Sequence, residues 1–292
     1  TRLLHLPAVT AYLVAGLLLG PFFLGRLNVP GLGFNTLEEV NVLSIVSQTA
    51  LGFIAFAMGN EFRLSQLRTI GSRAIIIGIL QAVITTIVVD VILLLLHLFF
   101  PHIISVPCAI TLGAIAAATA PAATLMVVRQ YKADGPMTRL LMLVVALDDA
   151  VGLLLFSVSF GIATALSNGQ VSVLAVVVEP IVEILLSVGL GGFMGLLLHW
   201  VERFFHSRSK RMSLSVAFVM LTVGLSMLEF QIGPVHCGFS LLLVCMMTGT
   251  IFCNVCPTSE ELMERVDGWT MPLNILFFVI SGAELDLNVL SQ

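Results

Sequence analysis

The chain has 292 residues, of which 58% are hydrophobic and 10% are charged, and its mean hydropathy is +1.08. Soluble domains carry about 25% charged residues, so this composition excludes an ordinary water-soluble protein and makes lipid the main solvent. The formal net charge is −4, and no basic or aromatic array favours nucleic acid as a partner. We therefore expect an all-α, polytopic protein of the cell membrane.

Apolar stretches recur along the whole chain, each near the roughly 20 residues that a helix needs to cross a bilayer. With these spans, the Lys and Arg residues fall on one side, which the positive-inside rule assigns to the cytoplasm, and Arg26 is the exception. The nine predicted spans are Pro7 to Leu24, Val40 to Gly59, Ala74 to Phe99, Ile104 to Val128, Leu140 to Leu166, Val171 to Trp200, Ser213 to Phe230, Cys237 to Cys253 and Met271 to Leu290.

The third span contains polar residues that a lipid-facing helix does not need. Gln81 and Thr85 lie one turn apart and share a face, while Asp90 is expected nearer the outer side. Such residues more often serve helix packing through side-chain hydrogen bonds. A functional role for Gln81 is the alternative.

The fourth span contains a run of small and polar residues around a proline, Thr119-Ala120-Pro121, with Thr124 following. Proline removes a backbone N–H and clashes with the preceding turn, so we expect the helix to break there. A break at membrane depth survives only where it is buried in protein or lines a water-filled cavity. In transporters such breaks expose helix ends that hold ions; the alternative is a proline kink in a tightly packed helix.

The fifth span places Asp148 and Asp149 inside an apolar run. A helix that starts near Leu140 puts them roughly 12 to 14 Å deep, near the membrane midplane. An ionisable group there costs about 2.5 kcal/mol or more, which indicates a functional site. A buried salt bridge is the alternative, but the predicted spans place no Lys or Arg at that depth.

Neighbouring helical residues point about 100° apart, so the two acids must differ in role. A hard carboxylate there can take either a proton or Na⁺, Li⁺ or K⁺.

The later acids are less decisive. Glu179 and Glu183 flank Pro180, where ion access and subunit contact compete as interpretations, and Glu284 is either within the membrane or interfacial. The connection from Asn254 to Thr270 is interpreted as a solvated amphipathic segment without chemistry. Its neighbouring C-x-x-C pair has no second pair and no nearby His in the sequence, so it only weakly indicates a metal or redox site. The cysteines are interpreted mainly as packing residues.

Four stretches resemble the monovalent cation/proton antiporter superfamily, in the branch that includes the bacterial sodium/proton antiporters. They are Pro7 to Pro21, the break at Thr119 to Pro121, the pair Asp148-Asp149, and Phe277 to Asp286. The resemblance implies an inverted repeat in which a mobile core bundle moves against a dimerisation bundle, and hence a homodimer. It also implies further helices after Gln292, including a second broken helix, so that residues 1–292 form a partial exchanger domain whose second core repeat is incomplete.

By this resemblance, Asp149 carries the proton or a transiently bound monovalent cation, and Asp148 is its partner, which in electrogenic members pairs with a lysine. The ion- and proton-binding set also includes Thr119, Ala120 and Pro121 of the break, and supporting roles fall to Gln81, Glu284 and Thr124. The function expected is secondary active cation/proton exchange by alternating access, without a cofactor or enzymatic activity.

Three other functions stay open at this point. One is Kef-like potassium efflux by proton antiport, and another is a non-transporting sensor or partner subunit built on an antiporter-like half. An intramembrane aspartyl protease is the third, although it needs carboxylates from two helices and the Gly-x-Gly-Asp context is missing around Asp148.

Overall fold

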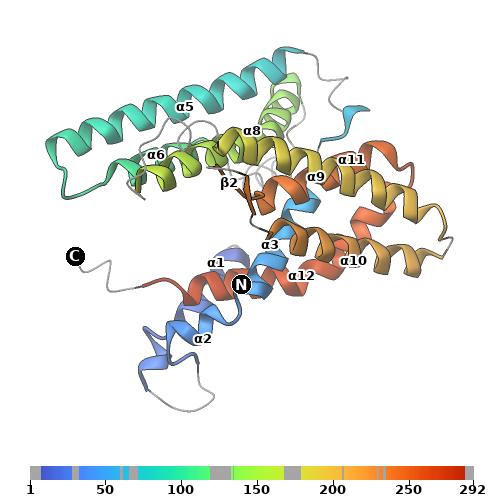
Figure 1. Ribbon diagram of the computed structural model, residues 1–292, viewed down its shortest axis with the longest axis horizontal. Coiled ribbons are helices and arrows are strands. Elements are labelled where there is room, and N and C mark those ends of the chain that lie inside the picture. The colour runs from blue at the N-terminus through green and yellow to red at the C-terminus, as the bar shows by residue number, and fades with distance from the viewer. Residues whose placement is uncertain are drawn as a thin grey trace.

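The computed structural model describes residues 8–27, 33–59, 62–65, 72–118, 133, 135–167, 179–205, 207–228, 230–232 and 235–286. The regular structure in this part of the chain is helical apart from one short hairpin (Figure 1). The helices are α1 (Ala8–Leu19), η1 (Leu24–Leu27), α2 (Leu37–Asn41), α3 (Ser44–Gly59), α5 (Ser72–Phe99), α6 (Val106–Ala116), α8 (Pro136–Ser167), α9 (Glu179–Glu202), α10 (Arg208–Ser226), α11 (Leu241–Val255) and α12 (Ser259–Ala283).

Each of the nine predicted spans overlaps a described helix. Three helical stretches are long and apolar enough to cross a membrane, namely Val9–Leu27, Ile75–Phe99 and Ile181–Glu202. A fourth is the bent pair Ser259–Val266 and Gly268–Ala283, which meet at 41°. Shorter apolar helices add Ser44–Gly59, Val106–Ala116, Val151–Ser167 and Leu241–Val255. The chain is therefore a helical membrane protein with several apolar spans, and the count of nine stays a prediction.

The surface of α5 shows which solvent the protein meets. Along this helix Ile84, Ile87, Val91 and Ile92 are each at least half exposed. Continuous apolar surface of this kind is rare on soluble monomers. Lipid is the medium in which it is stable.

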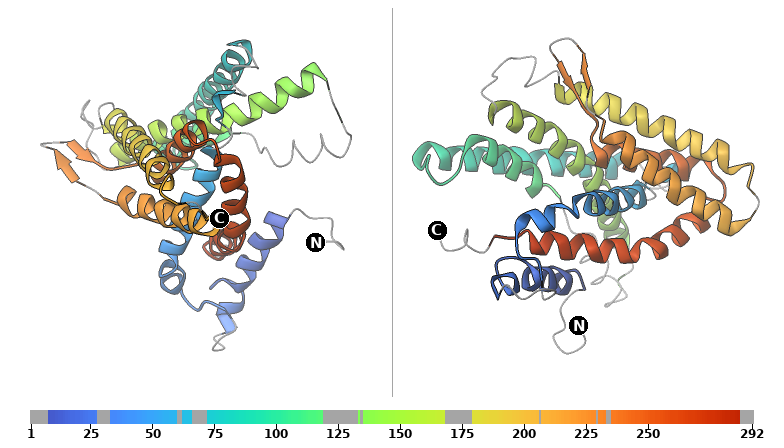
Figure 2. Two further views of the ribbon diagram at one scale, coloured as in Figure 1. Left: turned by 90° about the vertical axis from the view of Figure 1, so that its right-hand side faces the viewer. Right: turned by 60° about the horizontal axis from the view of Figure 1, so that its bottom comes forward.

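The helices form two groups (Figures 1 and 2). In one group α5, α6 and α8 pack against one another; in the other, α11 packs against both α9 and α3, and α12 lies against α3 and α1. Contacts of α8 with α9 and α11 join the groups. The third, fourth and fifth predicted spans therefore make a unit of their own.

Close backbone approach holds α1 against α12. A Cβ added at Gly16 would overlap the Val279 carbonyl, and one at Gly282 would overlap the Leu13 carbonyl. Helix association in lipid depends on close packing of small residues, because lipid tails offer no hydrophobic gain. The first and last of the four family-like stretches are thus in contact.

The core of the second group lies around α3 and α11. Phe53 and Phe56 of α3 and Phe252 of α11 are each 1% exposed or less, and the rings of Phe56 and Phe252 are 6.3 Å apart. Leu198 of α9 and Val219 of α10 complete the same cluster. This core fixes the ends of α9, α11 and α12 relative to one another.

Two sequence predictions need correction. The ninth helix begins at Ser259 and not near Met271, because Leu262, Met263 and Val266 bury one face of this segment in the core while Glu260 and Glu264 stay exposed. The segment is amphipathic as predicted, but it is a packed helix. The seventh span was predicted to run to Phe230, but α10 ends at Ser226. The strands β1 (Phe230–Ile232) and β2 (Val235–Cys237) then pair antiparallel, with Phe230 opposite Cys237.

Candidate ion-binding site

Asp148 lies in the middle of α8 and is completely buried. Its carboxylate faces α5, where Gln81 donates a hydrogen bond from Nε2 to Oδ2 at 2.8 Å. A buried carboxylate is costly unless it is hydrogen-bonded, and the amide of Gln81 supplies one such bond. The structure therefore joins two of the residues singled out in the sequence, across two helices of the same group.

Thr86, another polar residue of α5, does not contact α8 through its described hydrogen bond. Thr86 is buried and donates its hydroxyl hydrogen to the Ala82 carbonyl on its own helix at 3.0 Å. This is the usual local bond of a membrane threonine. Gln81, in contrast, reaches the neighbouring helix, so it is both an interhelical contact and a contact to the candidate ion-binding carboxylate.

The end of α6 lies next to the same part of α8. The helix α6 ends at Ala116 with Ala117 as its C-cap, and an added Cβ at Gly152 would lie 3.7 Å from the Cβ of Ala118. Gly152 is about one turn beyond the Asp pair. The chain leaves the helix immediately before Thr119, beside the turn of α8 that follows Asp149.

Several predicted site residues lie outside the described part. These are Thr119, Ala120, Pro121 and Thr124, and also the side chain of Asp149, whose backbone belongs to α8. The predicted break at Thr119 to Pro121 and the predicted ion-binding role of Asp149 therefore stay predictions.

Asp90, the other polar residue singled out in the third span, points into the α5–α6 interface. Its buried Oδ1 has no hydrogen-bond partner among the described residues, and an added Cβ at Gly113 would overlap that oxygen. Asp90 is nine residues beyond Gln81, which corresponds to roughly 13 to 14 Å along the helix axis. It is a second membrane carboxylate, separate from the Asp148 contact.

The remaining acids lie elsewhere. Glu284 is exposed at the C-cap of α12, the helix that packs on α1 and α3. Glu183 is half-buried in α9, and its backbone carbonyl accepts a hydrogen bond from Ser187 at 2.6 Å. The side chain of Glu179 is outside the described part.

Basic residues predicted to share the cytoplasmic side meet at one end of the second helix group. Arg211 donates to Thr258 at 2.8 Å, Arg63 donates to Ser259 at 3.2 Å, and Arg208 forms an ion pair with Glu261 at 3.3 Å. The end of α3, the α9–α10 connection and the α11–α12 connection therefore lie together, as the positive-inside rule requires.

The profile of the family described as "Sodium/hydrogen exchanger, transmembrane" matches residues 1–292. The chain belongs to this family. Comparison with curated proteins gives no match. The exchanger is thus a membrane transporter of the monovalent cation/proton antiporter superfamily, with cations and protons as substrates, and family membership places it among transporters and not among proteases.

Proposed function

We propose that this exchanger moves a monovalent cation against protons by alternating access, with Asp148 and Asp149 of α8 as the ion site in the cell membrane. The observation that supports the proposal is the buried Asp148 carboxylate, bonded to Gln81 at 2.8 Å beside the end of α6. An ionisable group at membrane depth is a functional group by default.

The two carboxylates divide the work. Gln81 anchors Asp148 to α5, which holds that side chain in one orientation. Asp149 points about 100° away around the helix and exchanges its proton for the cation. Because one carboxylate cannot hold both ions, binding of either one releases the other, and this competition couples the two fluxes.

The helix groups suggest which parts move. The unit of α5, α6 and α8 contains the Asp pair and Gln81, and its contacts with the other group run mainly through α8. Rocking of this unit against α3, α9, α11 and α12 would expose the site alternately to each side. The second group, paired with its copy in a homodimer, would be the fixed support.

The test uses the full-length protein in proteoliposomes with a pH-sensitive dye inside. Pulses of Na⁺, Li⁺ and K⁺ should release protons from the lumen, and the preferred ion separates sodium exchange from Kef-like potassium efflux. Exchange should fall at acid pH, where the carboxylate stays protonated; a rate that is flat from acid to alkaline pH contradicts competition at one site. Absence of exchange with all three ions would favour the sensor alternative.

Variants then assign the roles. We expect Asp149→Asn to abolish exchange and Asp148→Asn to weaken it or change its ion coupling, with both proteins monodisperse in detergent. The matched control is Asp90→Asn, which changes another membrane aspartate at a different depth and should keep cation-dependent exchange. Normal exchange by Asp149→Asn refutes the assignment, and identical behaviour of the Asp148 and Asp149 variants refutes the division of roles.

A further inference from the structure

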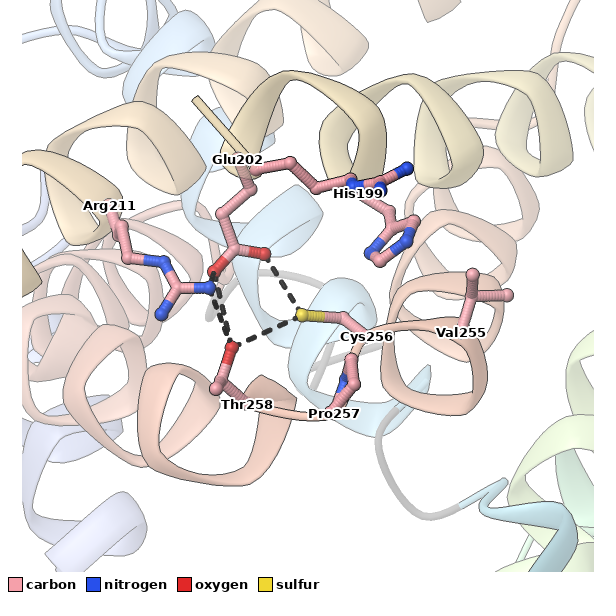
Figure 3. Close-up of a pocket in the computed structure, with 8 residues that line it drawn as sticks. His199, Glu202, Arg211, Val255, Cys256, Pro257 and Thr258 are labelled. Carbon is pink, nitrogen blue, oxygen red and sulfur yellow. Dashed lines mark hydrogen bonds and ion pairs between the residues drawn. The ribbon is translucent and has the colours of Figure 1, made fainter. Parts of the chain in front are cut away.

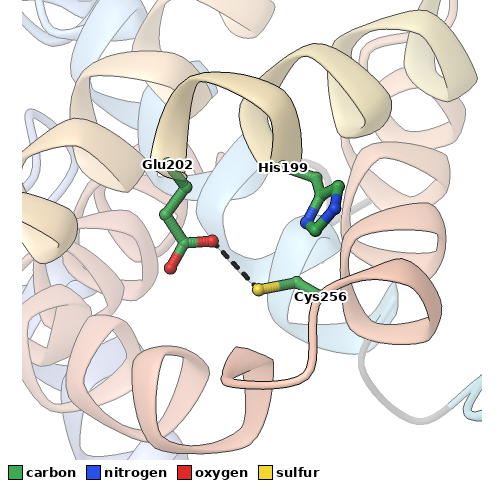
Figure 4. Close-up of side chains that lie close together, drawn as sticks. All are labelled: His199, Glu202 and Cys256. Atoms are coloured by element: carbon green, nitrogen blue, oxygen red, sulfur yellow. Dashed lines mark hydrogen bonds between the residues drawn. The ribbon is translucent and has the colours of Figure 1, made fainter. Parts of the chain in front are cut away.

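Three side chains of metal-ligand type converge far from the Asp pair, at the end of α9 and the end of α11. His199 and Glu202 lie three residues apart on α9 and share a face, and Cys256 follows the last residue of α11. One ligand atom from each residue lies within 4.8 Å of the others, and Figure 4 shows the three side chains pointing toward one another.

Two of the three side chains are buried, and the cluster borders a cavity. Glu202 is 1% exposed and Cys256 is 5% exposed, while Nδ1 of His199 is buried and lacks a hydrogen-bond partner in the part of the chain that the structure describes. The cavity, whose lining side chains are drawn in Figure 3, has a volume of about 520 Å³. Its lining comprises His199, Glu202, Arg203, Arg211, Val255, Cys256, Pro257 and Thr258. A small ion and its water can therefore reach the cluster.

The two oxygens of Glu202 have different partners. Oε1 forms an ion pair with Arg211 at 2.6 Å, and Oε2 accepts a hydrogen bond from the Cys256 thiol at 3.0 Å. The Cys256 thiol therefore points at Oε2, and a cation placed between these two groups would be shared by both.

The other cysteine of the C-x-x-C pair does not join the cluster. Sγ of Cys253 donates to the Gly59 carbonyl at 3.6 Å and to the Thr250 carbonyl at 3.2 Å, so it faces α3 and its own helix. The C-x-x-C spacing is therefore not a pair of ligands. The ligand partners of Cys256 come instead from α9, which lies 54 residues away in the chain.

We propose that His199, Glu202 and Cys256 bind a Zn²⁺ ion that joins the ends of α9 and α11. Thiolate, imidazole and carboxylate are the ligands that Zn²⁺ takes, at about 2.0 to 2.3 Å. A tetrahedral ion needs its ligand atoms roughly 3.3 to 3.8 Å apart, which small side-chain rotations provide here. Alkali cations prefer oxygen ligands, so a site with sulfur and nitrogen discriminates against the transported ion.

On binding, the S–H bond of Cys256 breaks, a Zn–S bond forms, and the proton leaves to water through the cavity. Glu202 exchanges its thiol hydrogen bond for a bond to the metal through Oε2, while Arg211 stays on Oε1 as the partner that orients the carboxylate. The positive charges of Arg203 and Arg211 oppose a cation, and the carboxylate and the new thiolate offset them. A water molecule from the cavity completes the fourth position.

The test uses the full-length protein, purified under reducing, metal-free conditions, with Co²⁺ as a spectroscopic substitute for Zn²⁺. We expect a thiolate-to-cobalt absorption band in the near ultraviolet, visible bands of tetrahedral intensity, and loss of both when Zn²⁺ is added. Zn²⁺ should also raise the unfolding temperature, because a ligand that binds only the folded state stabilises it.

Matched variants assign the ligands. Cys256→Ser should lose the near-ultraviolet band, and His199→Gln should weaken Co²⁺ binding at least ~10-fold, whereas Cys253→Ser should bind like the original protein. Absence of a thiolate band, or a band that survives Cys256→Ser and disappears in Cys253→Ser, overturns the proposal. If Cys256→Ser does not fold, maleimide labelling of Cys256 in the unsubstituted protein is measured instead. Zn²⁺ should protect Cys256 from the maleimide, and unchanged labelling in the presence of Zn²⁺ refutes the site.

Discussion

Replacement of Gln81 by leucine tests the contact that supports the proposed ion site. Leucine occupies a similar volume but cannot donate to Asp148, so the buried carboxylate loses its bond from α5. Hydrogen bonds to charged groups contribute about 1.5 to 3 kcal/mol, whereas neutral bonds between membrane helices average about 0.6 kcal/mol. The proposed ion site makes Asp148 an ionised acceptor, so the first range applies, and the donor–acceptor distance of 2.8 Å agrees with it. We therefore expect a coupling energy of about 1.5 kcal/mol or more.

A double-mutant cycle isolates this energy from other effects of the substitution. The free energy of unfolding is measured in mixed micelles with increasing SDS for the original protein, Gln81→Leu, Asp148→Leu and the double variant. The loss caused by Gln81→Leu should nearly vanish once Asp148 is absent. Thr85→Val, one turn along α5, is the matched control and should have the same effect in both backgrounds.

Additive effects in this cycle would refute the reasoning. Distant, independent sites add to within roughly 0.5 kcal/mol, so a coupling energy below that value would mean that the Gln81–Asp148 bond does not stabilise the protein. The proposed division of roles between Asp148 and Asp149 would then lose its structural support, even if both residues proved necessary for exchange.

Three further predictions concern packing and the α9–α11 end. Gly191→Ala should lower stability by about 1 to 3 kcal/mol through overpacking, because an added Cβ would overlap the Val244 carbonyl. The control Gly192→Ala has open space around the new Cβ and should be neutral or stabilising, so equal unfolding temperatures of the two variants would contradict this prediction. Arg211→Met should lower the free energy of unfolding by about 3 to 5 kcal/mol, because the buried Glu202 carboxylate loses its ion-pair partner. Adding Glu202→Gln should restore much of that stability in the same SDS titration, and no recovery in the double variant would argue against the ion pair as the cause. Burial and the Glu202 carboxylate raise the pKa of the Cys256 thiol. In metal-free protein whose other cysteines are replaced, the rate of maleimide labelling should therefore rise with pH along a curve that lies at higher pH than the curve of a free thiol. A curve that coincides with that of a free thiol would contradict this prediction.

Hydropathy was sufficient to locate the helices, because lipid requires an apolar run wherever a helix crosses the membrane. The predicted helix boundaries were wrong where tertiary packing determines them. Glu260 and Glu264 interrupt the apolar run before Met271, so the sequence suggested a solvated connection. Leu262 and Val266 nevertheless anchor that segment in the core, and α12 begins at Ser259.

The candidate site was predictable in part. The position of Asp148 within a helix and the polar face of α5 follow from the sequence pattern. Which helix Gln81 contacts depends instead on how α5 packs against α8, and no local pattern encodes that. The cluster at His199, Glu202 and Cys256 was missed for the same reason, since its members come from separate helices. A signal existed: His199 and Glu202 at i, i+3 lie at the end of the sixth predicted span, and Cys256 lies shortly after the end of the eighth, on the same predicted side.

The glycine contacts between α1 and α12 also constrain how the protein is made. Gly16 is synthesised well before its neighbour Val279, which lies roughly 260 residues later in the chain. At about 5 to 20 residues per second, the first helix must stay in the bilayer for more than ten seconds before its partner arrives. During that interval its small-residue face is open to other helices or to chaperones of membrane insertion.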